Sequence, residues 1–414
     1  MRTVGLIVEY NPFHNGHLYH LRQSAKITEA DAVVAVMSGH FLQRGEPAMW
    51  DKWTRARMAL AGGCDLVIEL PVAYAAQAAE WFAYGAVSLL EATGVVDAFC
   101  FGTESGRLAP LLMAADLAAD EPPDFRSLLK SKLETGQSYP AAYSETIQAY
   151  LKARGDMEAA AFPFDQPNHT LGLHYLIAHR RIRGAMKPYT IAREKAQYNQ
   201  TSITDGAIAS ATAIRKLTLE SGALEEIRPF VPATTYEVLM DRHADGIPPV
   251  HWEHYKDALF HTLSTSSPHR LSELREITEG LEHRLLHAWP ELQEWSIDSL
   301  LACLKTKRYT RTKLQRALLS ILLGHAKQDF TQEKLASGVQ YIRVLGFSKK
   351  GQSLLKRMRS AASLPVLMSA ARPPKPFRYL ELDVQATRAY MLGMPGAKLP
   401  SDLSRDFRDK PIMI

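Results

Sequence analysis

Two histidines near the start of the chain have the types and spacing of a phosphate-binding pair. His14 and His17 flank Gly16 in the segment EYNPFHNGHLYH, which begins at the end of an apolar run. Side chains three positions apart lie on one face of a helix, so both imidazoles can face the same point if a helix begins near Gly16. The N–H groups and positive end of that helix would attract a phosphate, and the glycine would let a nucleotide approach the backbone. We predict that both histidines stabilise charge on an α-phosphate during in-line attack.

A structural interpretation of the same histidines stays open. Two histidines three positions apart can cap a helix, or form an incidental metal site that lacks a third ligand. The pattern H-x-G-H is short, but its place after a strand and after Asn-Pro favours the chemical role.

A second candidate phosphate-binding segment is IASATAIRK at 208–216. Ser210 is suited to cap a helix whose first turn carries Thr212, and Arg215 one turn on could hold the β- and γ-phosphates. The alternative is an ordinary capped helix, but the position after the strand-rich part of the chain favours a functional role.

The first 200 residues contain a regular alternation of elements that would position these motifs. Short apolar runs typical of buried strands occupy 4–10, 32–39, 65–71, 98–104 and, less clearly, 188–194. Helical patterns separate them, at 18–25, 50–61 and 74–90. This alternation predicts an α/β domain with a doubly wound parallel sheet.

Ligands bind such sheets at the carboxyl ends of the strands. We therefore expect the loops after Tyr10, Met37, Leu70 and Phe101 to build the site. From about residue 215 the pattern is predominantly helical, with a turn at Gly346 and a proline-rich connector at 372–376. Two domains follow: an α/β domain at 1–220 that includes SATAIR, and a mainly α-helical, basic region at 221–414.

Composition and charge narrow the class of protein. The chain has 414 residues and a formal net charge of +5, but residues 301–414 hold 22 Lys+Arg against 7 Asp+Glu. A basic C-terminal part on an acidic body indicates a polyanionic partner, with a solvated basic surface as the alternative. Cys64, Cys100 and Cys303 are far apart, which excludes a disulfide framework and a structural zinc site. The absence of a signal-peptide pattern and of an apolar spanning stretch predicts a cytoplasmic protein with no membrane partner.

These motifs resemble the H-x-G-H nucleotidyltransferase superfamily, whose members join a carboxylate or phosphate to the α-phosphorus of a nucleotide. The resemblance implies a Rossmann-like sheet of the nucleotidyltransferase type. In the second motif Ala211 departs from the family pattern, where many members have serine, so one hydroxyl contact is in doubt. The segments EYNPFHNGH, MSGHFLQRGEPAMWDKW, FGTESG and QPNHTLGLHYL are more specific and resemble the bacterial tRNA(Met) cytidine acetate ligase family.

The resemblance implies a two-step enzyme. Acetate and ATP would give acetyl-adenylate and pyrophosphate, and the wobble cytidine of elongator tRNA(Met) would then accept the acetyl group. It also implies an ATP-binding set that comprises Ile7, Val8, Glu9, Tyr10, Asn11, His14, Asn15, Gly16, His17, His20, Gly102, Asn168 and Arg193, beside Ser210, Thr212 and Arg215. Magnesium is expected only as the counter-ion of ATP, since Glu9 and Asp51 belong to no cluster with metal-ligand spacing.

Other residues have two interpretations. Arg44, Lys52 and Arg55 either contact the acetyl-adenylate or the tRNA end, or form a solvated helix face. The expected tRNA-binding cluster is Lys305, Lys307, Arg308, Arg311, Lys313 and Arg316. Lys313 and Arg316 are expected to point to solvent from a helix at 312–323 whose apolar face packs inward. A second basic cluster contains Lys349, Lys350, Lys356, Arg357 and Arg359.

Two rival functions stay open at this point. A small-molecule adenylyltransferase would share the histidine motif, but such enzymes are usually a single compact domain. A non-catalytic RNA-binding protein with a vestigial nucleotide fold would not need His14, Gly16 and His17 intact.

Overall fold

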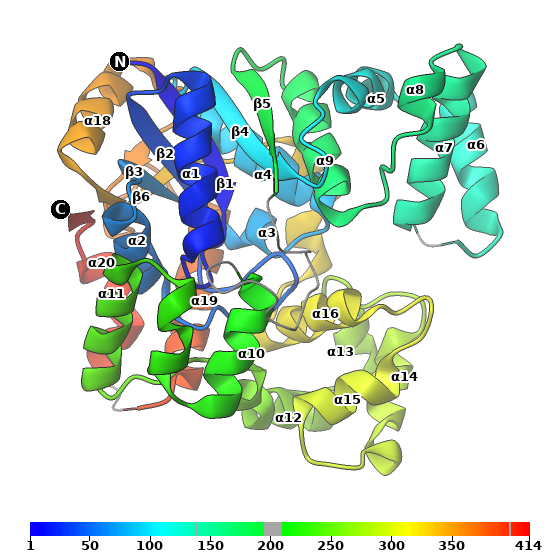
Figure 1. The fold of residues 1–414 in the computed structure, drawn as a ribbon. Helices are drawn as coiled ribbons and strands as arrows, with labels where there is room; N and C mark the ends of the chain where they lie inside the picture. The colour runs from blue at the N-terminus through cyan, green and yellow to red at the C-terminus, as the bar shows by residue number, and fades with distance from the viewer. Residues whose placement is uncertain (138, 194–208, 397–398) are drawn as a thin grey trace.

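A central sheet organises the molecule in the computed structural model, which describes residues 1–137, 139–193, 209–396 and 399–414 (Figure 1). The five predicted strands are present as β1 (Thr3–Val8), β2 (Ala32–Ser38), β3 (Leu66–Leu70), β4 (Ala98–Thr103) and β5 (Lys187–Ala192). Residue 194 of the predicted fifth run lies outside the described residues. The order β5-β4-β1-β2-β3 is parallel throughout, which confirms the predicted α/β fold with a parallel sheet.

Both faces of this sheet are covered, as the near-continuous apolar runs require. One face packs against α1 (Asn15–Thr28) and α2 (Lys52–Ala61), where Leu6, Met37 and Leu21 share a buried cluster. The other face packs against α4 (Ala79–Ala92) and α9 (Pro167–Arg181), and Val36 and Leu89 belong to the larger cluster there. The sheet is therefore doubly wound.

The predicted helix at 74–90 is wrong in one respect, because it is two helices. It divides into α3 (Val72–Ala75) and α4, with Ala78 extended between them. Tyr74 lies so close to Gly85 that a Cβ on the glycine would come within 2.3 Å of the Tyr74 ring. The close packing of α3 against α4 requires the turn that periodicity alone does not reveal.

The C-terminal region is mainly helical, but it also extends the sheet. Here β6 (Ile342–Phe347) runs antiparallel to β3, while β7 (Val366–Leu367) and β8 (Ile412–Met413) pair with β6. The expectation of a turn at Gly346 is wrong, because Gly346 lies inside β6. A Cβ there would come within 2.7 Å of the Leu60 side chain, so the glycine admits α2. The domain boundary at residue 220 stays a prediction, although one sheet draws strands from both sides of it.

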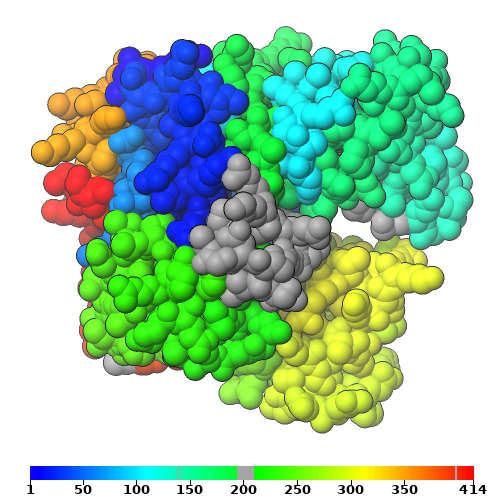
Figure 2. Space-filling model, in the orientation of Figure 1, coloured from blue at the N-terminus to red at the C-terminus, as the bar shows by residue number. Residues whose placement is uncertain are grey.

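The other helices surround this sheet. They are α5 (Ala109–Asp120), α6 (Pro123–Glu134), α7 (Tyr139–Ala153), α8 (Met157–Ala160), α10 (Ala211–Ser221), α11 (Ala233–Ala244), α12 (Lys256–Thr265), α13 (Pro268–Ser272), α14 (Leu281–His287), α15 (Ile297–Leu304), α16 (Arg311–Leu323), α17 (Gln332–Ala336), α18 (Lys349–Ala361), α19 (Arg378–Gly393) and α20 (Arg405–Arg408). Figure 2 shows α6–α8 and α13–α16 as two separate lobes on one side of the molecule. Within the described ranges, no helix combines the length and apolar character that crossing a bilayer demands.

Candidate active site

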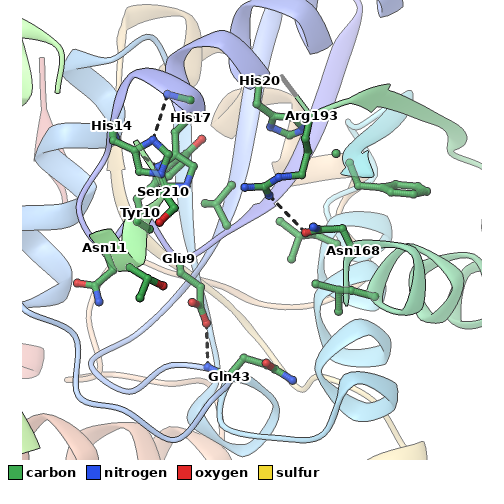
Figure 3. A pocket seen from close by; sticks show the side chains of 18 of the residues that line it. Glu9, Tyr10, Asn11, His14, His17, His20, Gln43, Asn168, Arg193 and Ser210 are labelled. Atoms are coloured by element: carbon green, nitrogen blue, oxygen red, sulfur yellow. Dashed lines mark hydrogen bonds between the residues drawn. The ribbon is translucent and has the colours of Figure 1, made fainter. Parts of the chain in front are cut away.

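One cavity collects almost all of the predicted nucleotide-binding residues. It lies at the carboxyl ends of β1, β4 and β5 and is closed by the start of α10 (Figure 3). Every residue of the predicted set lines it except Asn15, whose side-chain amide donates a hydrogen bond to the Pro229 carbonyl at 2.9 Å. Residues as far apart in the chain as Ile7 and Arg215 thus meet at one place, as the sheet topology predicts.

The H-x-G-H histidines cap α1 and also face this cavity. His14 is the N-cap residue, and its Nδ1 accepts a hydrogen bond from the Gly16 N–H at 3.0 Å. His17 Nδ1 accepts from the His14 N–H at 3.3 Å, and the two rings stack with centroids 3.7 Å apart. Because both Nδ1 atoms act as acceptors, each neutral ring carries its proton on Nε2. Capping therefore sets the tautomer in which Nε2–H is the donor.

The expected contribution of free helix amides at this point is partly wrong. The Gly16 N–H is bonded to His14 Nδ1, and the N–H groups of His17 and Leu18 both donate to the His14 carbonyl. The histidine side chains occupy the position at the helix start that a phosphate would need to reach those amides. Any phosphate in the cavity would therefore meet imidazole N–H groups before backbone ones.

The histidines around the cavity are neutral at physiological pH. Burial, with Arg193 and Arg215 nearby, lowers the pKa of His14 to about 3. Burial and Arg193 lower the pKa of His20 to about 4, and burial and the adjacent His14 lower the pKa of His17 well below its ordinary value. Neutral imidazoles donate hydrogen bonds without adding net charge, so the positive charge of the site comes from arginine.

Two arginines reach the cavity from different elements. Arg193, directly after β5, donates to Asn168 Oδ1 at 3.3 Å, and Glu104 holds the Asn168 amide nitrogen at 2.8 Å. Arg215 in α10 donates to the Asn11 carbonyl at 3.3 Å and to Thr212 Oγ1 at 3.2 Å. Guanidinium groups are suited to bidentate contacts with phosphate oxygens. The cavity is therefore built for an anionic ligand.

The second motif adopts the predicted capped helix. Ser210 is the N-cap of α10, and its hydroxyl accepts a hydrogen bond from the Ala213 N–H at 3.0 Å. Ala211 and Thr212 follow in the first turn and line the cavity. The first N–H groups of a helix have no partners within it and attract anions. Ile208, at the beginning of the motif, lies outside the described residues.

Gly102 leaves space in the wall that β4 contributes. A Cβ at this position would lie 3.4 Å from Arg193 Cγ and 3.7 Å from the His20 ring. The protein alone would nearly accommodate an alanine here. The gap is therefore consistent with the close approach of a flat ligand to the backbone.

The loop between β2 and α2 adds residues that sequence reasoning missed. Gln43 and Glu46 line the cavity. Arg44, which was expected either to contact the ligand or to lie on a solvated helix face, lines it too. The Gln43 N–H donates to Glu9 Oε1 at 2.8 Å. The loop after β2 was expected to contribute to the site, but the segment LQRGEP does not indicate which of its side chains face the cavity.

An apolar wall was also missed. Phe82, Phe101, Leu171 and Tyr175 line the cavity beside the polar groups. A signal for two of them exists in QPNHTLGLHYL, because Leu171 and Tyr175 follow Asn168 at helical positions i+3 and i+7. The expected loop after Leu70 does not reach the cavity, since α3 begins at once and packs against α4.

Both interpretations of Lys52 and Arg55 are wrong, because the two side chains are completely buried. Lys52 Nζ forms ion pairs with Glu69 at 2.7 Å and with Asp406 at 2.8 Å. Arg55 donates to the carbonyls of Glu9 and Ser38 at 2.6 and 3.0 Å, and also to that of Gly39. Arg55 therefore holds the backbone after β1 and β2, and Lys52 joins β3 to α20. Neither side chain lines the cavity.

The predicted tRNA-binding cluster surrounds the start of α16, but most of its cations face carboxylates. Arg316 pairs with Glu276 at 2.9 Å and is only 11% exposed, so the expectation that it points to solvent is wrong. Lys313 and Arg308 pair with Glu279, and Arg311 pairs with Asp298. The acidic partners come from α15 and from the segment before α14, which the periodicity of α16 cannot reveal.

Lys305 and Lys307 are exposed at the start of the same surface. The second basic cluster lies on α18, on the opposite side of the molecule from α16 (Figure 1). There Lys350 donates to the Asp31 carbonyl and Arg357 to the Met1 carbonyl. The two clusters are therefore separate surfaces.

The buried neutral histidines make stability depend on pH. His14, His20 and His174 have pKa values lowered to between about 3 and about 4, mainly by burial. Below pH 6.5 the unfolded chain binds protons that the folded chain does not. The free energy of unfolding therefore decreases as the pH is lowered. Each histidine contributes up to about 1.4 kcal/mol per pH unit in this window.

Urea unfolding at pH 7.5 and 5.5 measures this loss. His174→Leu, which removes a buried ring remote from the H-x-G-H motif, should make the pH dependence shallower. Equal stability at the two pH values would contradict the prediction.

Comparison with known proteins places the chain among relatives of full length. The model of the HIGH nucleotidyl transferase family matches residues 1–406. The tRNA(Met) cytidine acetate ligase of Lysinibacillus sphaericus is 40% identical over 414 residues, with 100% of both chains covered. The relative of the same name from Bacillus velezensis is also 40% identical, with 100% of this chain and 97% of that protein covered.

Solved structures agree with this placement. The crystal structure of apo TmcAL from Thermotoga maritima is 35% identical and superposes with a TM-score of 0.91, covering 100% of both chains. A second crystal structure of that protein, bound with alpha-thio ATP, is 34% identical with a TM-score of 0.89 and the same coverage.

Proposed function

This chain belongs to the HIGH nucleotidyl transferase family and, within it, to the tRNA(Met) cytidine acetate ligases, and from that premise we propose how its cavity performs the reaction. The protein is an ATP-dependent acetate ligase. Acetate and ATP give acetyl-adenylate and pyrophosphate, and the exocyclic amine of the wobble cytidine in elongator tRNA(Met) then takes the acetyl group. AMP leaves, and the tRNA carries N4-acetylcytidine.

The observation that carries this function is the neutral histidine pair beside two arginines. In the proposed first step, the acetate oxygen attacks the α-phosphorus, and negative charge grows on the non-bridging oxygens. Nε2–H of His14 and His17 would donate to those oxygens, as donors do in an oxyanion hole. Arg193 and Arg215 would hold the phosphates, assisted by the start of α10.

Magnesium would enter as part of the substrate, bound to the phosphates of ATP. Glu9 and Glu46 are the carboxylates that line the cavity. Across the described ranges, no three His, Cys, Asp or Glu side chains gather closely enough to hold a metal ion by themselves. We therefore assign no resident metal.

We place the reaction in the cytoplasm, where its tRNA substrate is found.

The tRNA would approach along the surface around the start of α16. Gln315 in α16 donates to Glu46 Oε1 at 3.1 Å, which joins this helix to the loop that lines the cavity. The contact is close, since a Cβ on Gly45 would lie 2.6 Å from the Arg316 backbone nitrogen. A tRNA held here would have its target base within reach of the cavity. Neither rival function is favoured by any observation.

Removal of the two exposed lysines on this surface should weaken tRNA binding. In the double variant Lys305→Ala, Lys307→Ala, the slope of log K against log[salt] should become shallower by about one to two units, because each phosphate contact contributes roughly 0.7–0.9. Filter binding over a salt series measures the slope. The matched control is the double variant Lys356→Ala, Arg359→Ala on α18. If only this control variant changed the slope, the tRNA-binding surface would lie on α18 instead.

Acetate-dependent exchange between ATP and labelled pyrophosphate tests the activation step. The exchange should occur without tRNA, because the cavity contains all the groups assigned to adenylation. Rapid quenching with labelled ATP should also trap acetyl-adenylate on the protein. If AMP forms only with tRNA and no acetyl-adenylate can be trapped, activation and transfer are not separate steps.

A further inference from the structure

A carboxylate stands in a cavity otherwise built for phosphates. Glu9 directly follows β1 and lines the cavity beside Gln43 (Figure 3). Its Oε1 accepts the Gln43 N–H at 2.8 Å, and its main-chain carbonyl accepts a hydrogen bond from the buried Arg55 at 2.6 Å. Among the described residues, no side chain or backbone group forms a hydrogen bond with Oε2. Glu9 is thus held firmly with one oxygen to spare.

The chemistry of the triphosphate does not explain this group. A carboxylate repels phosphate oxygens, and the cavity supplies arginine and histidine for them. The partner that needs a carboxylate is a donor of N–H groups, and the exocyclic amine of cytosine is such a donor. That amine is also a poor nucleophile, because its lone pair is delocalised into the ring, so it must lose a proton as it attacks.

We propose that Glu9 is the catalytic base of the acetyl-transfer step, a role that rests on the proposed function. The cytidine nitrogen forms a bond to the acetyl carbon, and the bond from that carbon to the phosphate oxygen breaks. AMP leaves with the electron pair of that bond. The proton of the amine passes to Glu9 Oε2 and from there to solvent, so the step needs no further reactant.

The surroundings of Glu9 suit this role. Burial raises the pKa of Glu9, although the Gln43 N–H and the Arg215 guanidinium oppose the rise. A base of higher pKa accepts a proton more readily near neutral pH. Glu46, the other carboxylate of the cavity, also accepts a hydrogen bond at one oxygen, from Gln315, but it lies on the loop after β2. Asp51 is held as the N-cap of α2. Glu9 directly follows β1, on the segment that carries His14 and His17, and is therefore the carboxylate nearest in the chain to the proposed α-phosphate donors.

The variant Glu9→Gln separates this role from the rest of the reaction. Glutamine keeps an oxygen for the Gln43 N–H but cannot take the proton. Single-turnover transfer from preformed acetyl-adenylate to tRNA should slow by about 10²–10⁴, and this loss should far exceed any loss of acetate-dependent ATP–pyrophosphate exchange. Hydroxylamine, a strong nucleophile that needs no base, should form acetohydroxamate equally fast with both proteins.

The matched control is Glu253→Gln, which alters a carboxylate outside the cavity that also accepts backbone N–H groups, from Ile297 and Asp298. It should leave exchange and transfer unchanged. If Glu9→Gln does not fold, Glu9→Asp replaces it, and transfer is again expected to slow by much more than exchange.

Normal transfer by either folded variant would overturn the proposal. So would a loss of exchange as large as the loss of transfer, because Glu9 would then serve the nucleotide. Absence of acetate-dependent exchange in the wild-type protein would instead overturn the proposed function itself.

Discussion

Replacing His17 by alanine should slow formation of acetyl-adenylate by about 10²–10³, the loss typical of one oxyanion-type donor. The imidazole is neutral because of burial and the adjacent His14, and its Nδ1 is engaged by the His14 N–H. Its Nε2–H is therefore the donor that a growing charge on the α-phosphate would meet. Acetate-dependent ATP–pyrophosphate exchange measures the effect.

His17 also caps α1, so the substitution must be separated from a loss of folding. A second histidine pair provides the control: His254 Nδ1 accepts the His251 N–H at 3.2 Å, and the rings are 4.0 Å apart. His254→Ala removes the same kind of capping bond outside the cavity, at a cost of about 1 kcal/mol. Its exchange rate should be that of the wild type. Near-normal exchange by His17→Ala would end the assignment.

Replacing Lys52 by methionine should reduce the free energy of unfolding by about 3–5 kcal/mol. Burial alone would lower the pKa of Lys52, but the carboxylates of Asp406 and Glu69 outweigh it and raise the pKa, so the side chain is charged. Its removal leaves Glu69 buried without its ion-pair partner, and leaves Asp406 paired with Arg343 alone among the described residues, at 3.5 Å. Urea unfolding of the full-length protein measures the loss.

Lys130→Met is the matched control, because Lys130 lies on α6 with its side chain 79% exposed. That substitution should change stability by no more than about 0.5 kcal/mol. A Lys52→Met protein as stable as the control would show that the buried ion pairs contribute nothing to folding. Asp406 belongs to the C-terminal helix α20, so this prediction also tests whether the ion pair between α2 and the end of the chain stabilises the fold.

The sequence was sufficient for those parts of the structure in which local pattern and topology agree. The apolar runs identified β1 to β5, and the strand-end rule placed the site at the ends of these strands. Gly102, Asn168 and Arg193 came instead from the resemblance to the ligase family, and the structure places all three in the cavity with the histidines although they are distant in the chain. The histidine pair illustrates a further point: capping and ligand contact were treated as alternatives, whereas both histidines cap α1 through Nδ1 and also line the cavity.

The remaining features depend on contacts between distant segments. Nothing local distinguishes Lys52 in a buried ion pair from a lysine on a solvated helix, because its partners Glu69 and Asp406 are 17 and 354 positions away. Arg316 was expected in solvent for the same reason, since its partner Glu276 lies 40 positions away, in the segment before α14. The strand β6 was missed because it joins the sheet antiparallel to β3, outside the strand–helix alternation.

The central claim is that this cavity activates acetate with ATP and passes it to a cytidine of tRNA. Labelled acetate, ATP and elongator tRNA(Met) are incubated with the protein, and the tRNA is digested to nucleosides. We expect one N4-acetylcytidine for each AMP released, with the label at the wobble position and no labelled tRNA without ATP. Acetylation that proceeds without ATP, or AMP release that leaves the tRNA unlabelled, would contradict it.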